Sequence, residues 1–165
     1  MNNPERAKFQ QLVTMARQYC SVIDRLPTRA DWLAPLFRLL PQLHAAVVAM
    51  DHREGSSYPP GTADLEDRFD LYSELHTLLG ERDRYWLEYD HPDEPGLDGE
   101  HRTGSLADDL TDIYFELRRG LTLLETVEAD EVANLWQSGY RQHWGQHLVD
   151  AERHLYSLNI RDRLR

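Results

Sequence analysis

Apolar side chains recur three or four positions apart along most of the chain, which is the spacing of helices with one buried face. The first such segment begins at Pro4 and carries its polar side chains on the opposite face. Its apolar positions are Phe9, Leu12, Val13, Ala16, Tyr19, Cys20 and Ile23. The pattern predicts an amphipathic helix that ends before Pro27.

The segment 32–50 is apolar on almost every side, which is typical of a central, buried helix. Pro35 fits the first turn of this helix. Pro41 lies inside the pattern, where its ring removes a backbone hydrogen bond, so we expect it to kink or split the helix.

Three further helices follow from the same periodicity. One covers 65–79 and stops at Gly80, and one begins with Ser105 as its N-cap and runs to about Leu124. Asp130 is placed to cap a last helix that ends near Asn159. Nothing alternates as a β-strand would. The sequence therefore predicts an all-α fold, a compact bundle of about five helices with a Pro-kinked central helix.

A chain of 165 residues is about one domain, so we expect a single helical domain over residues 1–165. Its acidic, Pro- and Gly-rich segment from about 90 to 104 is expected to be a loop, and the basic end from about 160 to 165 a frayed tail. The single cysteine, Cys20, excludes an intramolecular disulfide and a thiolate metal site. Neither an apolar leader nor a membrane span is apparent, so we expect a cytoplasmic location and no membrane partner.

The net charge of −11 is unevenly distributed. Between Asp64 and Glu131 there are 21 acidic side chains against 6 basic ones, whereas the flanking segments are slightly basic. An acidic centre repels phosphate backbones, so binding of nucleic acid is not expected.

Long runs of the sequence resemble the bacterial family known as domain of unknown function 5063. The specific runs are "SLADDLTDIYFELRRGL" from Ser105 and "YRQHWGQHLVDAERHLYSL" from Tyr140, with weaker similarity in the first three helices. The resemblance implies an all-helical domain and supplies no activity. In that family the position after Trp-Gly-Gln is commonly basic, and here it is His147.

A polar stripe on the predicted last helix is the sharpest chemical feature. It consists of His143, His147, Asp150 and His154, at i, i+4, i+7 and i+11. Two histidines one turn apart with a carboxylate one turn further along can chelate a divalent metal. The other interpretation is a polar border beside the apolar face of the helix.

A second cluster consists of carboxylates on the helix that begins at Ser105: Asp108, Asp109, Asp112 and Glu116. Paired carboxylates can share a proton or hold Mg²⁺. We expect Asp108 and Asp112 to point outward, so that the four do not converge on one ion. The alternatives are a solvated acidic face and a buried carboxylate paired with an arginine of another helix.

Because no convincing catalytic set is apparent, we expect a small interaction or accessory protein without catalysis of its own, which binds a protein partner or a second copy of the chain. The expected contacts are aromatic anchors and the basic tail: Tyr85, Trp86, Tyr89, Trp136, Arg161, Arg163 and Arg165. Trp136 also fits a core stripe. No cofactor is expected in this case. The alternative is a metal-dependent or carboxylate-based enzyme that uses the stripe of His143, His147, Asp150 and His154.

Overall fold

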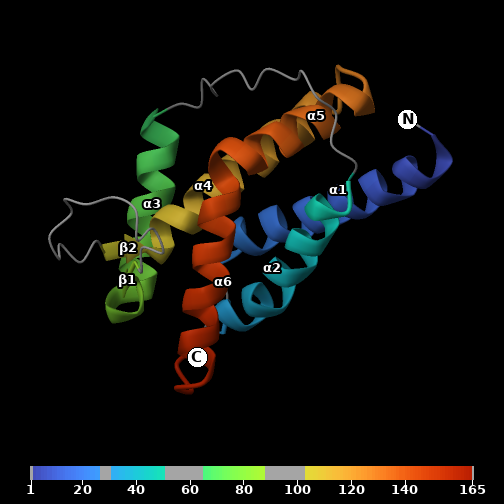
Figure 1. Cartoon of the computed structure of the whole chain (residues 1–165). Helices are drawn as coiled ribbons and strands as arrows, with labels where there is room; N and C mark the ends of the chain where they lie inside the picture. The colour runs from blue at the N-terminus through green and yellow to red at the C-terminus, as the bar shows by residue number, and fades with distance from the viewer. Residues whose placement is uncertain (1, 27–30, 51–64, 88–102, 165) are drawn as a thin grey trace, which may run out of the picture.

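A computed structural model describes residues 2–26, 31–50, 65–87 and 103–164 (Figure 1). Within these residues the chain forms five helical rods, which confirms the prediction of a compact all-α bundle. The elements in chain order are α1 (Asn3–Ile23), α2 (Leu33–Val48), α3 (Leu65–Leu79), η2 (Gly80–Arg82), β1 (Arg84–Trp86), β2 (Thr103–Ser105), α4 (Leu106–Leu123), α5 (Ala129–Gly139), η3 (Tyr140–Trp144) and α6 (Gly145–Asn159).

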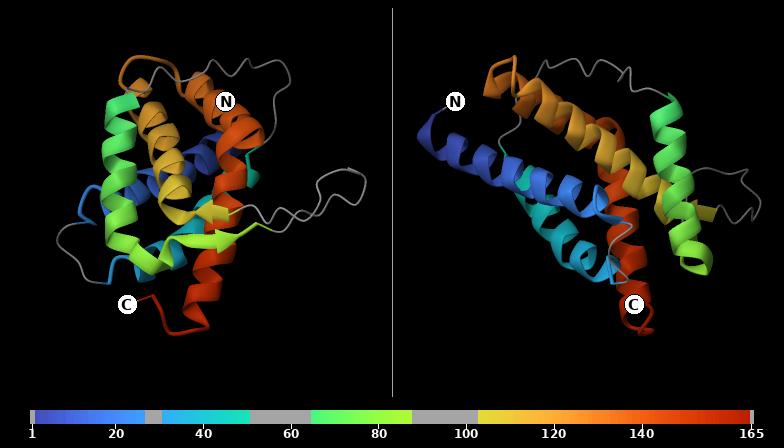
Figure 2. Two further views of the ribbon diagram at one scale, coloured as in Figure 1. Left: turned by 90° about the vertical axis from the view of Figure 1, so that its left-hand side faces the viewer. Right: turned by 180° about the vertical axis from the view of Figure 1, so that it is seen from behind.

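Helix α4 lies at the centre of the bundle and packs against α1, α3, α5 and α6. Helix α2 lies against α1 and α6, and α3 lies on the other side of α4 (Figure 2). The buried apolar side chains form one core cluster, in which Trp136 and Trp144 are the largest members. Because α4 contacts both α3 and α6, side chains of these three helices meet around its first turns.

Helix α1 follows the sequence pattern closely. All seven apolar positions expected on its inner face are buried, and Tyr19 also donates a hydrogen bond of 2.8 Å to the backbone oxygen of Leu110 in α4. Asn2 and Glu5 form a capping box that satisfies backbone groups at the start of the helix. Local pattern and capping therefore specify this element.

Helix α2 continues through Pro41 rather than splitting there. Pro41 is exposed, so the backbone oxygen that loses its intrahelical partner lies on the side of the helix that faces water. The neighbouring Gln42 is exposed as well, and α2 therefore covers the bundle with one face instead of being buried on all sides.

A short antiparallel ribbon, β1–β2, precedes α4 and was not expected from the sequence. Its second strand occupies residues assigned to the end of the predicted loop. Tyr85 lies opposite Gly104, where a Cβ atom would come within 2.3 Å of the tyrosine ring. The buried carboxylate of Asp83 accepts hydrogen bonds from the Ala107 backbone N–H (2.7 Å) and the Ser105 hydroxyl (2.9 Å). The ribbon thus fixes the start of α4, where Ser105 is the N-cap as predicted.

The last predicted helix is continuous from α5 to α6, but its hydrogen-bonding pattern changes to that of a π-helix in η3. The chain changes direction at this point (Figure 1). Gly145 allows the turn, because a Cβ atom there would lie 2.2 Å from the backbone oxygen of Tyr140. A π-turn rotates the side chains that follow it relative to an ideal helix, and such turns occur often at functional sites.

The C-terminal segment is packed as far as Leu164, whereas we expected a frayed tail. The Arg163 N–H donates to the Leu158 backbone oxygen at 2.9 Å, and Asp162 adopts a positive φ of 53°. These features close α6 and return Leu164 to the core, where it is 8% exposed. Most of the expected acidic loop, residues 90–102, and Arg165 lie outside the described residues. No helix in the described ranges is long and apolar enough to cross a bilayer.

Candidate functional site

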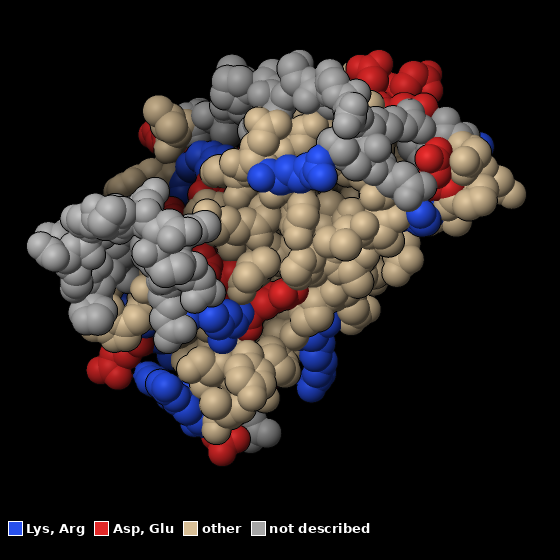
Figure 3. Space-filling view, viewed as in Figure 1, with Lys and Arg blue, Asp and Glu red and all other residues tan. Residues whose placement is uncertain are grey.

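Charged side chains of both signs are interspersed on the face of the molecule drawn in Figure 3. The uneven charge along the sequence therefore does not produce a one-sign surface on this face. A close grouping of ionisable side chains is instead partly buried, between α4 and the junction of η3 with α6.

The acidic side of this grouping comes from α4. Asp109, Asp112 and Glu116 are spaced three and four residues apart, so they lie on one side of the helix. The side chains of Asp109 and Glu116 are each 5% exposed, and that of Asp112 is 14% exposed. Asp108 is exposed, as predicted, whereas Asp112 points inward, contrary to the prediction.

The basic side consists of His143 in η3 and His147 in the first turn of α6. Their rings meet edge to face, with centroids 5.2 Å apart. Both side chains remain partly accessible, at 38% and 23%. The two histidines therefore form the open side of a site whose carboxylate floor is nearly buried.

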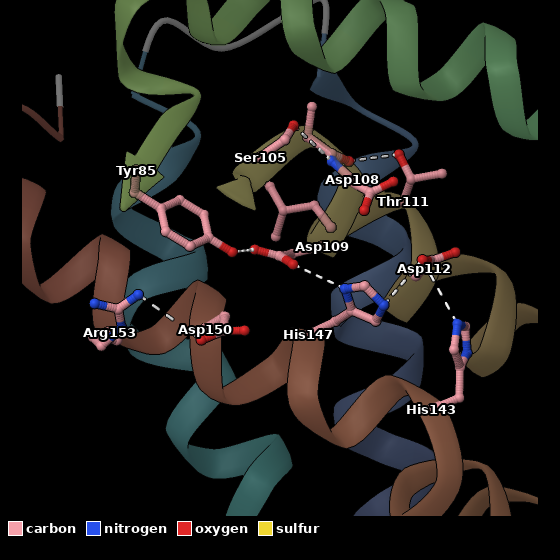
Figure 4. Close-up of polar contacts among 12 residues, drawn as sticks. Tyr85, Ser105, Asp108, Asp109, Thr111, Asp112, His143, His147, Asp150 and Arg153 are labelled. Carbon is pink, nitrogen blue, oxygen red and sulfur yellow. Dashed lines mark hydrogen bonds and ion pairs between the residues drawn. The ribbon is translucent and has the colours of Figure 1, made fainter. Parts of the chain in front are cut away.

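Each histidine ring faces two carboxylates, and Figure 4 shows His147 between Asp109 and Asp112, with His143 on the other side of Asp112. For His147, Nδ1 lies 2.9 Å from Oδ1 of Asp109, and Nε2 lies 3.2 Å from Oδ2 of Asp112. For His143, Nδ1 lies 3.6 Å from Oε1 of Glu116, and Nε2 lies 3.8 Å from the same Oδ2 of Asp112. Both Nε2 atoms thus converge on one oxygen of Asp112, while each Nδ1 atom faces a separate carboxylate.

Two residues outside α4 and α6, one in β1 and one in α3, hold these carboxylates. The hydroxyl of Tyr85 in β1 donates to Oδ2 of Asp109 at 2.5 Å. Arg68 in α3 pairs with Oδ1 of Asp112, and its guanidinium lies over the ring of Phe115, 5.1 Å from the centroid. One alternative from the sequence analysis, a carboxylate paired with an arginine of another helix, is therefore found at Asp112.

The ionisation of the central groups is shifted by their surroundings. Burial raises the pKa of Asp109, although the hydrogen bonds from His147 and Tyr85 act in the opposite direction. Burial alone would lower the pKa of His147, but its hydrogen bond to Asp109 and the charge of Asp112 raise the pKa above its usual value. In the absence of another cation, a proton on His147 is therefore favoured between the two carboxylates.

The stripe predicted on the last helix does not act as one set. Asp150 lies 4.0 Å from Arg153, and His154 contacts the backbone oxygen of Arg82 through Nε2 at 2.7 Å. The ring of His154 also packs against Tyr85, with centroids 4.7 Å apart. His143 and His147 are thus joined by acids of α4 rather than by the next two members of their own helix.

The expected partner-binding residues are distributed differently from the prediction. Trp136 is fully buried and donates from Nε1 to the Glu116 backbone oxygen at 3.1 Å, so it belongs to the core. Trp86 is 62% exposed, and Arg161 and Arg163 are exposed. The hydroxyl of Tyr85 donates its hydrogen bond to Asp109 within the site. Tyr89 and Arg165 lie outside the described residues.

A group of three side chains could hold a metal ion. One ligand atom from each of Asp112, His143 and His147 lies within 4.8 Å of the other two. The i, i+3, i+7 spacing of Asp109, Asp112 and Glu116 puts the three acids on one side of α4, but it does not indicate that this side faces η3 and α6. No signal in the sequence identified Arg68, because its pairing depends on how α3 packs against α4.

Comparison with known proteins assigns a family without an activity. The family model described as domain of unknown function (DUF5063) matches residues 4–161, and the chain belongs to this family. Among solved structures, protein BF1032 from Bacteroides fragilis is similar, with a TM-score of 0.70 and 20% sequence identity over 90% of this chain and 89% of that chain. This similarity shows a shared fold. The search of curated proteins gave no match.

Proposed function

We propose that this DUF5063 protein binds a divalent transition metal through Nε2 of His143, Nε2 of His147 and Oδ2 of Asp112. The observation that carries the proposal is the convergence of these side chains, whose ligand atoms lie within 4.8 Å of one another. Two imidazoles and one carboxylate form a ligand set of the kind that suits Zn²⁺ and Fe²⁺ better than Mg²⁺ or Ca²⁺.

The distances support a small ion. In tetrahedral zinc sites, bonds of about 2.0–2.2 Å separate neighbouring ligand atoms by roughly 3.3 Å. Oδ2 of Asp112 lies 3.2 Å from one Nε2 atom and 3.8 Å from the other. The side chain of His143 is 38% exposed, which leaves room for its ring to rotate towards the other two ligands.

The outer contacts also suit a metal site. Histidines that bind metals usually donate their second ring N–H to a carboxylate or a backbone oxygen, which fixes the ring and selects the free nitrogen. Asp109 is in position to do this for His147, and Glu116 for His143. Nδ1 of His143 is buried and has no hydrogen-bond partner among the described residues, so a shift of about half an ångström towards Oε1 of Glu116, now 3.6 Å away, would give it one.

Three protein ligands leave at least one coordination position for water or another molecule. A bound ion with an open position can activate water, as in metal-dependent hydrolases. Alternatively, binding of the ion can make the protein a metal sensor. The proposal therefore retains the metal-dependent alternative of the sequence analysis, with Asp112 in place of Asp150 and His154.

The experiment is a calorimetric titration of chelator-treated protein with Zn²⁺, Mn²⁺ and, without oxygen, Fe²⁺. We expect one ion per chain for the wild type, and strongly weakened binding for Asp112→Asn and for the double variant His143→Gln, His147→Gln. Asp150→Asn is the matched control, because Asp150 belongs to the predicted stripe but not to the site, and it should bind as the wild type does. Absence of binding by every metal, or equal loss in Asp112→Asn and Asp150→Asn, would refute the proposal.

A second candidate function, an interaction protein, is favoured by the exposed indole of Trp86. An aromatic side chain that is 62% exposed is a typical interface anchor, and the exposed Arg161 and Arg163 would contribute charge. Affinity capture with the wild type, Trp86→Ala and the double variant Arg161→Gln, Arg163→Gln tests this function. Point variants are preferable to truncation, because Leu164 is part of the core. If all three forms capture the same proteins and have the same mass in solution, this surface is not an interface.

A further inference from the structure

The two oxygens of Asp112 face different cations. Oδ2 is directed towards the histidines, at 3.2 Å and 3.8 Å, whereas Oδ1 is paired with Arg68. The carboxylate is largely buried, with 14% of its side chain exposed, and the arginine side chain is 24% exposed. An ion bound at Oδ2 would therefore share one carboxylate with the guanidinium.

Two cations on one partly buried carboxylate repel each other. The interaction between charges a few ångströms apart is several times stronger at a protein surface or interior than in bulk water. A divalent ion at Oδ2 also neutralises the negative charge that attracts Arg68. Metal binding and the Arg68–Asp112 ion pair thus oppose each other.

The arginine belongs to the less firmly packed part of α3. The fully buried side chains of this helix, Leu75 and Leu79, are both in its second half. In its first half, Leu65 is 81% exposed and Phe69 is 67% exposed. Arg68 connects this half to α4 through Asp112 and the ring of Phe115, and α3 lies alongside α4 in Figure 2.

We propose that Arg68 is a built-in competitor for the metal, and that metal binding at Asp112 loosens the first half of α3. The inference rests on the proposed function. Linkage requires the coupling to be reciprocal: if the metal weakens the Arg68 contact, removal of the arginine charge strengthens metal binding by the same factor. The metal would then control how tightly residues 65–72 are held against α4.

An arginine beside a metal ligand can instead orient that ligand, in which case its loss weakens metal binding. Two variants separate the roles. Arg68→Gln keeps an N–H donor that can orient Asp112 but removes the charge, whereas Arg68→Lys keeps the charge. Competition predicts that glutamine strengthens metal binding and that lysine leaves it near the wild-type value.

The test combines zinc titration with hydrogen exchange measured by mass spectrometry. Zinc affinity should rise at least about fivefold in Arg68→Gln, the lower end of typical coupling between sites, and stay near the wild-type value in Arg68→Lys. Zinc should accelerate exchange of backbone amides in residues 65–72 of the wild type. It should have little effect on these residues in Arg68→Gln, or on α1 in either protein.

The outcomes distinguish this inference from the proposed function. If the wild type binds none of Zn²⁺, Mn²⁺ and Fe²⁺, both are refuted; if it binds one of the other two ions instead of zinc, the same measurements are made with that ion. If the wild type binds zinc but Arg68→Gln binds equally or more weakly, the competition is refuted and the metal site stands. If zinc binds without changing hydrogen exchange in residues 65–72 of the wild type, the loosening of α3 is refuted. Because this measurement needs only the wild type, it also tests the inference if Arg68→Gln does not fold.

Discussion

Replacement of Asp109 by asparagine tests the buried side of the site. The carboxylate of Asp109 is 5% exposed and accepts hydrogen bonds from the Tyr85 hydroxyl at 2.5 Å and from His147 Nδ1 at 2.9 Å. Asparagine has nearly the same shape but offers one oxygen and one NH₂ group. One of the two donors therefore loses its acceptor, unless Tyr85 turns its hydroxyl hydrogen away.

The magnitude follows from these contacts. Hydrogen bonds to charged groups contribute about 1.5–3 kcal/mol each, and removal of a buried charge returns part of its desolvation cost. We expect Asp109→Asn to lower the free energy of unfolding by about 2 kcal/mol. For a chain of this size, that corresponds to a fall in Tm of roughly 4–8 °C. Zinc affinity should fall about 10–100-fold, because His147 loses the carboxylate that orients it.

Without metal, the free energy of unfolding is measured by urea unfolding followed by circular dichroism, and the Tm by scanning calorimetry. The zinc affinity is measured by calorimetric titration. Asp108→Asn is the matched control, since Asp108 is the exposed neighbour of Asp109 on α4, and it should stay within about 0.5 kcal/mol of the wild type. Equal stability of Asp109→Asn and Asp108→Asn would show that the contacts around Asp109 are not the ones described.

Three further predictions concern positions outside the metal ligands. Gly120→Ala should lower Tm, because its Cβ atom would lie 2.1 Å from Nε1 of the fully buried Trp136; overpacking of about 1–3 kcal/mol exceeds the gain of about 1 kcal/mol in helix propensity, and a higher Tm would contradict this. Burial lowers the pKa of His154 below the usual 6.5, so the neutral form stabilises the fold above that pH and this contribution is lost as pH falls below it. The control is His154→Gln, which keeps a donor for the Arg82 backbone oxygen. In urea unfolding, the free energy of unfolding of the wild type should fall relative to that of His154→Gln below pH 6.5. A difference that stays constant with pH would refute the lowered pKa of His154. Burial raises the pKa of Cys20 to about 12, so a disulfide reagent should label it far more slowly in native protein than in urea, and equal rates would contradict its position in the core.

The helices were predictable because their information is local. Every apolar position expected on the inner face of α1 is buried, and Ser105 caps α4 as its sequence indicates. The ribbon β1–β2 was not predictable from periodicity, since three residues per strand are too few to alternate recognisably. Trp136 fits both an interface and a core, and only packing against α4 decides for the core.

Of the candidate site, only the two histidines were predictable, because only their arrangement depends on local sequence. His143 and His147 are one turn apart on a continuous helical segment, so their pairing follows from spacing. The inward direction of Asp112 and its contact with Arg68 depend on the packing of α3 and α6 against α4, which a single sequence does not encode in any local pattern. His154 lies in the same regular helix as His147, but its ring contacts Tyr85, which belongs to the ribbon that was not expected from the sequence.

The most direct measurement of the central claim is the anomalous scattering of zinc in crystals of the zinc-treated protein. We predict one peak between α4 and the η3–α6 junction, at about 2.0–2.2 Å from Nε2 of His143, Nε2 of His147 and Oδ2 of Asp112. A zinc peak at other residues would contradict the claim. So would the absence of a peak at saturating zinc, with Nε2 of His147 still in direct contact with Asp112.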